Sequence, residues 1–105
     1  MTSSKWDAAL AACDDLEALL ADAYPAANPA LLARIQHVVS RLQGTSLPYV
    51  QMKAGMIASR AAIYLSAQRH EKEQGGAEGL MQDMRYRLLG GIREELREVR
   101  RQAGR

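Results

Sequence analysis

Apolar side chains recur every three or four residues in four runs of this 105-residue chain, and proline or glycine separates each run from the next. That spacing places apolar residues on one face of an α-helix, whereas a half-buried strand would need strict alternation. Composition agrees, because alanine and leucine are abundant while phenylalanine is absent. The content of 48% hydrophobic and 25% charged residues is ordinary for one globular domain and excludes a disordered chain. The sequence therefore predicts an all-α fold.

Local signals place the ends of the predicted helices. Asn28 is a preferred N-cap, and Pro29 follows at the first helical position, where its missing N–H costs nothing. Gly44 is expected to end that helix in a left-handed conformation, and Gly75-Gly76 must turn before the last helix. We expect helices over about residues 4–23, 29–43, 47–74 and 77–102. Short loops between them predict a single domain over 1–105, a four-helix antiparallel up-down-up-down bundle whose third and fourth helices form a long hairpin.

A glycine pair lies inside the last predicted helix. If that helix folds back on the third about Gly75-Gly76, each residue faces a residue of the other helix. The sequence numbers of two such facing residues then add up to about 151. Gly90 and Gly91 would then face Arg60 and Ala61. Each glycine inside a helix costs about 1 kcal/mol relative to alanine. We expect a close approach of the two backbones to offset this cost, and the alternative is a kink at Gly90.

The sequence does not assemble the residues that catalysis or metal binding needs. A di-iron bundle needs Glu-x-x-His pairs, and neither His37 nor His70 has a glutamate three residues before it. A zinc site needs several Cys or His ligands, but Cys13 lies far from both histidines in the chain. We expect no metal, no cofactor and no catalytic set, so the chain is not predicted to be an enzyme. An enzyme whose site is completed by its substrate is the remaining alternative.

Charge is distributed unevenly along the chain. Residues 1–28 carry one lysine and five acids, a net charge of −4, whereas residues 29–74 carry six bases and two acids, a net charge of +4. The last helix carries arginines at positions 93, 97 and 101, a spacing of four that aligns them on one side. Acids of the first helix are expected to form one acidic face. The candidate interaction surface comprises Arg34, His37, Arg41, Arg93, Arg97, Arg101, Asp7, Asp14, Asp15 and Asp22.

These observations favour a small non-enzymatic interaction protein, acting through its helical faces as an adaptor, chaperone-like factor or inhibitor. We expect a protein partner, including a second copy of the chain in a homodimer. The alternative is a nucleic-acid-binding protein that uses the arginine-rich end of the last helix, although Glu94, Glu95 and Glu98 are interleaved there. We expect no membrane span, because the most apolar stretch, residues 54–67, is too short. One cysteine and no secretory signal predict a cytoplasmic protein.

Overall fold

The part of the chain that the computed structural model describes contains α-helices and no strands, and its helices form a bundle of four. The described residues are 5–67, 70–73 and 75–104. The fourth helix is continuous from residue 76 to residue 103 but contains one wide turn, so it is divided into three elements. The elements are α1 (Lys5–Ala21), α2 (Pro29–Gln43), α3 (Pro48–Tyr64), the short 3₁₀ turn η1 (His70–Lys72), α4 (Gly76–Gln82), the π-helical turn η2 (Asp83–Leu88) and α5 (Leu89–Ala103).

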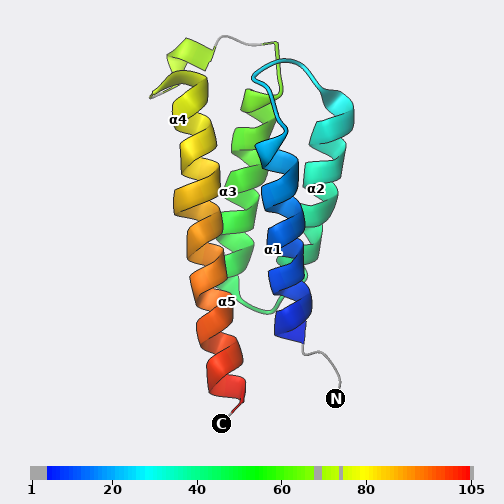
Figure 1. Ribbon diagram of the computed structural model, residues 1–105, viewed down its shortest axis with the longest axis vertical. Coiled ribbons are helices and arrows are strands. Elements are labelled where there is room, and N and C mark those ends of the chain that lie inside the picture. The colour runs from blue at the N-terminus through cyan, green and yellow to red at the C-terminus, as the bar shows by residue number, and fades with distance from the viewer. Residues whose placement is uncertain (1–4, 68–69, 74, 105) are drawn as a thin grey trace.

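The helices surround one apolar core. α1 and α3 each pack against both α2 and α5, so α1 lies diagonally across the bundle from α3. The first turn of α1 and the last turn of α5 lie at the same end of the molecule, which measures 48 × 25 × 20 Å (Figure 1). Side chains from every helix meet inside, and among the residues that the structure describes none that is buried is charged or polar. The residues with the largest fully buried side chains include Leu16, Leu20, Ile35, Leu42, Ile57, Met84, Leu88, Leu89, Ile92 and Leu96.

The predicted start of α2 is confirmed. The backbone N–H of Leu31 donates a hydrogen bond of 3.1 Å to Oδ1 of Asn28, and Pro29 occupies the first turn. Gly44 follows the last turn as expected, but its φ of −75° is right-handed, so the predicted left-handed cap is wrong. The two left-handed glycines are Gly75 and Gly76, where the chain turns into α4.

The third helix is shorter than predicted. It ends at Tyr64 rather than at residue 74, because the following polar segment offers no apolar face to bury. Nε2 of His70 lies 2.9 Å from the carbonyl oxygen of Ile63, so η1 folds back on the end of α3. α1 ends at Ala21 rather than at residue 23, and the predicted start at residue 4 lies outside the described residues.

The shorter α3 changes how it pairs with the last helix. The expectation that Gly90 and Gly91 face Arg60 and Ala61 is wrong. Arg60 forms an ion pair with Asp83 instead, and a Cβ on Gly91 would lie 2.9 Å from the hydroxyl oxygen of Tyr49. The sequence numbers of residues that face each other across the two helices therefore add up to about 140 and not 151, since the turn between the helices is centred near residue 70. A Cβ on Gly90 would meet nothing within 4 Å, and the helix continues through both glycines.

The wide turn η2 keeps the last helix in contact with the core. The buried residues Leu80, Met84, Leu88, Ile92 and Leu96 are spaced by four, and four residues of an α-helix turn about 40° too far. This drift would carry the buried face out of the core over several turns. In η2 the N–H of Leu89 bonds to the carbonyl of Met84, five residues back, and the wider turn rotates the face back toward the core.

Candidate functional site

Three residues of the predicted charged surface, Asp7, Asp14 and Arg93, take part in ion pairs that join α1 to α5 within the chain. Nη1 of Arg93 lies 2.6 Å from one carboxylate oxygen of Glu17, and Nη2 of Arg93 lies 2.9 Å from Asp14. Arg85 donates two hydrogen bonds of 3.1 Å to Glu17, and Arg100 pairs with Asp7 at 2.9 Å. The hydrogen bond from Arg93, with a further one from Arg85, lowers the pKa of Glu17 below its usual value. These side chains already pair between neighbouring helices of the same chain.

The predicted acids of α1 lie on one side of the helix but divide between two neighbouring helices. Asp7 and Asp14 point toward α5, whereas Asp15 pairs with Arg41 of α2 at 3.0 Å. The reason is angular: Asp14 and Asp15 are consecutive, so their side chains leave the helix about 100° apart. Asp22 is exposed and has no ion pair in the described part of the chain.

The arginines of α5 are divided as well. Arg93 is paired across to α1, and Arg101 is paired with Glu98 on its own helix. Arg97 is exposed and forms no ion pair with any residue that the structure describes. The structure therefore places the three arginines on one helix but leaves only Arg97 without a carboxylate partner.

Two other predicted residues, Arg34 and His37, line a hollow between α1 and α2. The hollow has a volume of about 520 Å³, and its apolar lining comes from both helices. Neither Arg34 nor the imidazole of His37 makes an ion pair or hydrogen bond within the described ranges. The hollow is lined by Asp15, Ala18, Leu19, Ala33, Arg34, His37 and Val38.

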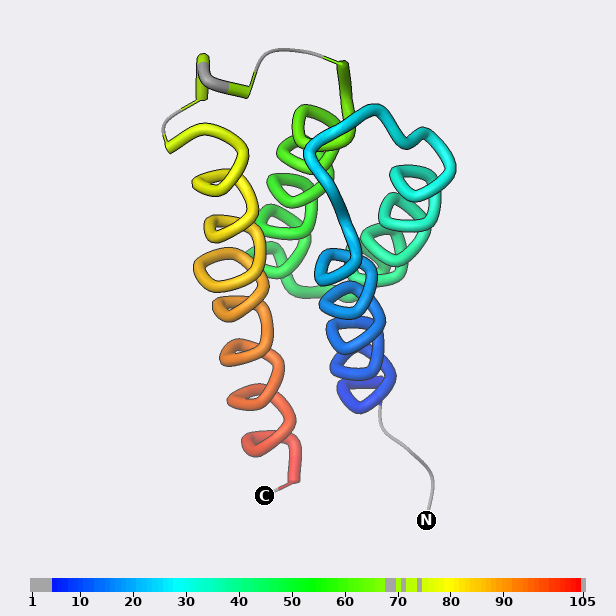
Figure 2. Tube along the Cα trace, turned by 45° about the horizontal axis from the view of Figure 1, so that its top comes forward, coloured from blue at the N-terminus to red at the C-terminus, as the bar shows by residue number. Residues whose placement is uncertain are grey.

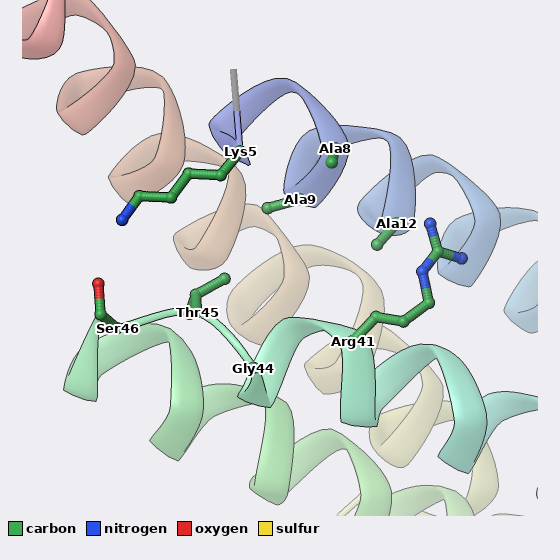
Figure 3. Close-up of a pocket in the computed structure, with 8 residues that line it drawn as sticks. All are labelled: Lys5, Ala8, Ala9, Ala12, Arg41, Gly44, Thr45 and Ser46. Carbon is green, nitrogen blue, oxygen red and sulfur yellow. The ribbon is translucent and has the colours of Figure 1, made fainter. Parts of the chain in front are cut away.

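A second hollow, of about 290 Å³, lies farther along the same helix pair, toward the connection between α2 and α3. Figure 3 shows Ala8, Ala9 and Ala12 of α1 on one side of it and Gly44 and Thr45 on the other. The two cations of its lining, Lys5 and Arg41, lie toward opposite ends in this view (Figure 3).

We call the two hollows together the α1–α2 groove. The ion pair between Arg41 and Asp15 separates them, because Arg41 lines the second hollow and Asp15 lines the first. α1 packs against α2, which lies on the side of α1 away from the orange and red helix α5 (Figure 2). The groove therefore follows the helix pair and is lined mainly by alanine and other small or apolar side chains.

A third hollow, of about 470 Å³, lies beside η2. Its acid, Asp83, accepts hydrogen bonds from Arg87 and forms an ion pair with Arg60, and Glu73 lines the same hollow. The hydrogen bonds from Arg87 and the charge of Arg60 hold the pKa of Asp83 below its usual value. A carboxylate held ionised in this way is a poor proton donor near neutral pH, so Asp83 is not suited to act as a general acid.

The remaining candidates for chemistry are buried or dispersed. Cys13 is fully buried on α1, and burial raises the pKa of its thiol to about 11. The reactive form of cysteine is the thiolate, so this position is suited to packing rather than to nucleophilic attack. Across residues 5–67, 70–73 and 75–104, no three His, Cys, Asp or Glu side chains come together as metal ligands. No described helix is long and apolar enough to cross a bilayer.

The sequence identified the charged rim of the groove but not its apolar lining. Ala18 and Ala33 are exposed and looked like ordinary helix-forming residues. A cluster of alanines on one side of α1, at positions 8, 12 and 18, was the available signal. Comparison with known proteins finds no matching family model, curated protein or solved structure.

Proposed function

We propose that this chain is a small non-enzymatic interaction protein that binds a protein partner through the α1–α2 groove. The observation that carries the proposal is the combination in that groove of an apolar lining with two side chains, Arg34 and His37, that have no partner among the described residues. Exposed apolar surface bordered by polar groups is typical of sites for protein association. We place the chain in the cytoplasm, because its one cysteine, Cys13, is buried and has no partner for a disulfide.

The arrangement of the helices agrees with such a role. We infer an antiparallel up-down-up-down order, supported by the short connections and by the ion pair that joins Asp7 near the start of α1 to Arg100 near the end of α5. In this order α1 and α2 are joined by one short connection, so the groove lies between two helices of fixed relative position.

Affinity capture with a matched pair of variants tests the proposal. The double variant Ala18→Gln/Ala33→Gln fills the larger of the two hollows of the groove with two neutral, helix-favouring side chains at exposed positions. Ala62→Gln makes the same change at an exposed position of α3, which lines neither hollow of the groove. A partner that uses the groove is retained by the wild type and by Ala62→Gln and lost by the double variant. Partners retained equally by all three chains would contradict the proposal.

A second copy of the chain is one partner to test. We propose a homodimer as the simplest closed assembly, and light scattering at about 0.05 and 0.5 M salt measures it. A dimer held by exposed charges weakens at the higher salt, whereas an apolar interface does not. A single monomer mass at about 100 μM in low salt would reject the homodimer while leaving other partners open.

Nucleic acid is the alternative partner. Its proposed site, the end of α5, has Arg93 and Arg100 bound to carboxylates of α1, so only part of the positive charge is available. Filter binding of a duplex at two salt concentrations separates the alternatives, because affinity for phosphates falls steeply with salt. Tight, salt-dependent binding that Arg97→Gln weakens would favour this alternative over the groove.

A further inference from the structure

We propose that the natural ligand of the α1–α2 groove is an acidic amphipathic helix of about four turns, supplied by another protein. This inference rests on the proposed function and adds the shape and charge of the partner. Three properties of the groove carry it: its length, the size of the side chains that line it, and the sign of its unpaired charges.

The length of the groove fits a helix better than a small molecule. On α1 its lining extends from Lys5 to Leu19, and on α2 and the following turn it extends from Ala33 to Ser46. At 1.5 Å per residue the α1 side is about 21 Å long, which matches a helix of about 14 residues. Two hollows in line along one helix pair accept apolar side chains that lie about two turns apart on such a helix, one on each side of the pair formed by Asp15 and Arg41.

The lining permits close approach. Where α1 meets α5, long side chains such as Arg93 and Glu17 cover the space between the helices. Where α1 meets α2, the lining includes exposed alanines at positions 8, 18 and 33, with the buried Ala12 beneath them. The distance between packed helices, 8–10 Å in general, is set by the side chains at the contact, and small ones allow the short end of that range.

The charge of the lining favours an acidic ligand. Both hollows together contain three cations, Lys5, Arg34 and Arg41, and a single acid, Asp15, which Arg41 already neutralises. Lys5 and Arg34 have no carboxylate partner within the described ranges; the Lys5 ammonium lies 4.5 Å from the centre of the Trp6 ring. They lie near opposite ends of the groove, so carboxylates on the first and last turns of a docked helix would meet them. A guanidinium such as that of Arg34 binds a carboxylate with two parallel hydrogen bonds.

Two designed peptides test the inference. Each has about 16 residues, roughly 24 Å as a helix, with leucines on one face. The first has glutamates beside the leucines, and the second has lysines at those positions. Fluorescence anisotropy with the full chain measures both affinities. We expect the glutamate peptide to bind at least tenfold more tightly than the lysine peptide, and we expect this difference to shrink between about 0.05 and 0.5 M salt.

Variants of the chain locate the binding. Arg34→Gln and Lys5→Gln should each weaken the glutamate peptide about twofold to fivefold, the effect of one exposed ion pair. Arg97→Gln removes an exposed arginine of α5 and should change nothing. Ala18→Gln/Ala33→Gln should abolish binding while Ala62→Gln leaves it intact. Circular dichroism of each variant confirms that the helices are retained.

The outcomes separate this inference from the proposed function. If the lysine peptide binds as tightly as the glutamate peptide and is blocked by Ala18→Gln/Ala33→Gln, the acidic partner is rejected and the groove remains a protein-binding site. If neither peptide binds, the acidic helix is rejected as well. The proposed function fails with it only if no captured partner distinguishes the double variant from Ala62→Gln.

Discussion

Replacing each of the adjacent glycines of α5 by alanine should have different effects on stability, although both lie in the same helical turn. A Cβ on Gly90 meets no atom within 4 Å, whereas a Cβ on Gly91 would lie 2.9 Å from the hydroxyl oxygen of Tyr49. Real Cβ atoms do not approach other atoms that closely, so Tyr49 has to move in Gly91→Ala. Tyr49 is 41% exposed, and its ring has room to move toward solvent.

The magnitudes follow from these contacts. Alanine is favoured over glycine inside a helix by about 0.8–1.0 kcal/mol, and Gly90→Ala should gain this amount in full. For a chain of this length the gain corresponds to a rise in Tm of about 4–5 °C. Gly91→Ala has the same backbone gain, but moving Tyr49 offsets part of it. In a Tyr49→Phe background the nearest ring atom is Cζ, 3.8 Å away, which is an ordinary contact. There Gly91→Ala should recover the full gain.

Thermal unfolding followed by circular dichroism, with urea titration as a second measure, checks this expectation. The set comprises the wild type, both alanine variants, Tyr49→Phe and the double variant, so the coupling between positions 49 and 91 is measured directly. A lower Tm for Gly90→Ala would show that the helix needs glycine next to η2. Equal gains for Gly90→Ala and Gly91→Ala in the wild-type background would show that Tyr49 does not pack on Gly91.

Other predictions concern the helix cap, the buried thiol and one ion pair. Asn28→Ala should lower the unfolding free energy by about 1 kcal/mol in urea, because the N–H of Leu31 loses its acceptor, and an unchanged midpoint would contradict this. Cys13 should resist iodoacetamide at pH 8 in the folded chain and react readily in urea, since burial raises its pKa to about 11; fast labelling of the folded chain would refute the burial. The lowered pKa of Glu17 stabilises the fold above its unfolded-state value of 4.5, and this contribution is lost as the pH falls through the folded-state pKa. Glu17→Gln should therefore show a weaker loss of stability below pH 4.5 than the wild type; an unchanged acid profile would contradict the pairing.

The sequence predicted α2 to the residue because both of its ends carry local signals. Asn28 and Pro29 define the start without reference to any other helix. The end of α3 carries no such signal, because Gln68 to Gln74 are good helix formers by composition. Whether such a segment continues a helix depends on an apolar face that packs, and this segment has none. The error in the end of α3 also made the predicted register of the last two helices wrong, because the turn between them was predicted at residue 75 and lies near residue 70.

The sequence predicted neither the wide turn η2 nor the groove, because each depends on the position of a neighbouring helix. The four-residue spacing from Leu80 to Leu96 was visible, and its drift in an α-helix could have indicated an irregular turn. No local sequence signal shows which turn of the helix takes up the additional residue of a π-helical turn. Its place depends on the position of α3, where Arg60 pairs with Asp83. The groove likewise exists only when two helices meet, so Ala18 and Ala33 could not be recognised as its lining from either helix alone.

The two sides of α1 explain why its charges divide as they do. On the side facing α5, Glu17 and Asp14 are fixed by arginines, and the long side chains that form these pairs fill the surface between the helices. On the side facing α2, the pair between Asp15 and Arg41 stands alone between two alanine-lined hollows. If the chain needed only internal stability, longer apolar residues at positions 18 and 33 would bury more surface and add to it. Small exposed residues instead leave this side open beside Arg34, which pairs with no carboxylate in the described part of the chain, and this is the side on which we propose that a partner's helix docks.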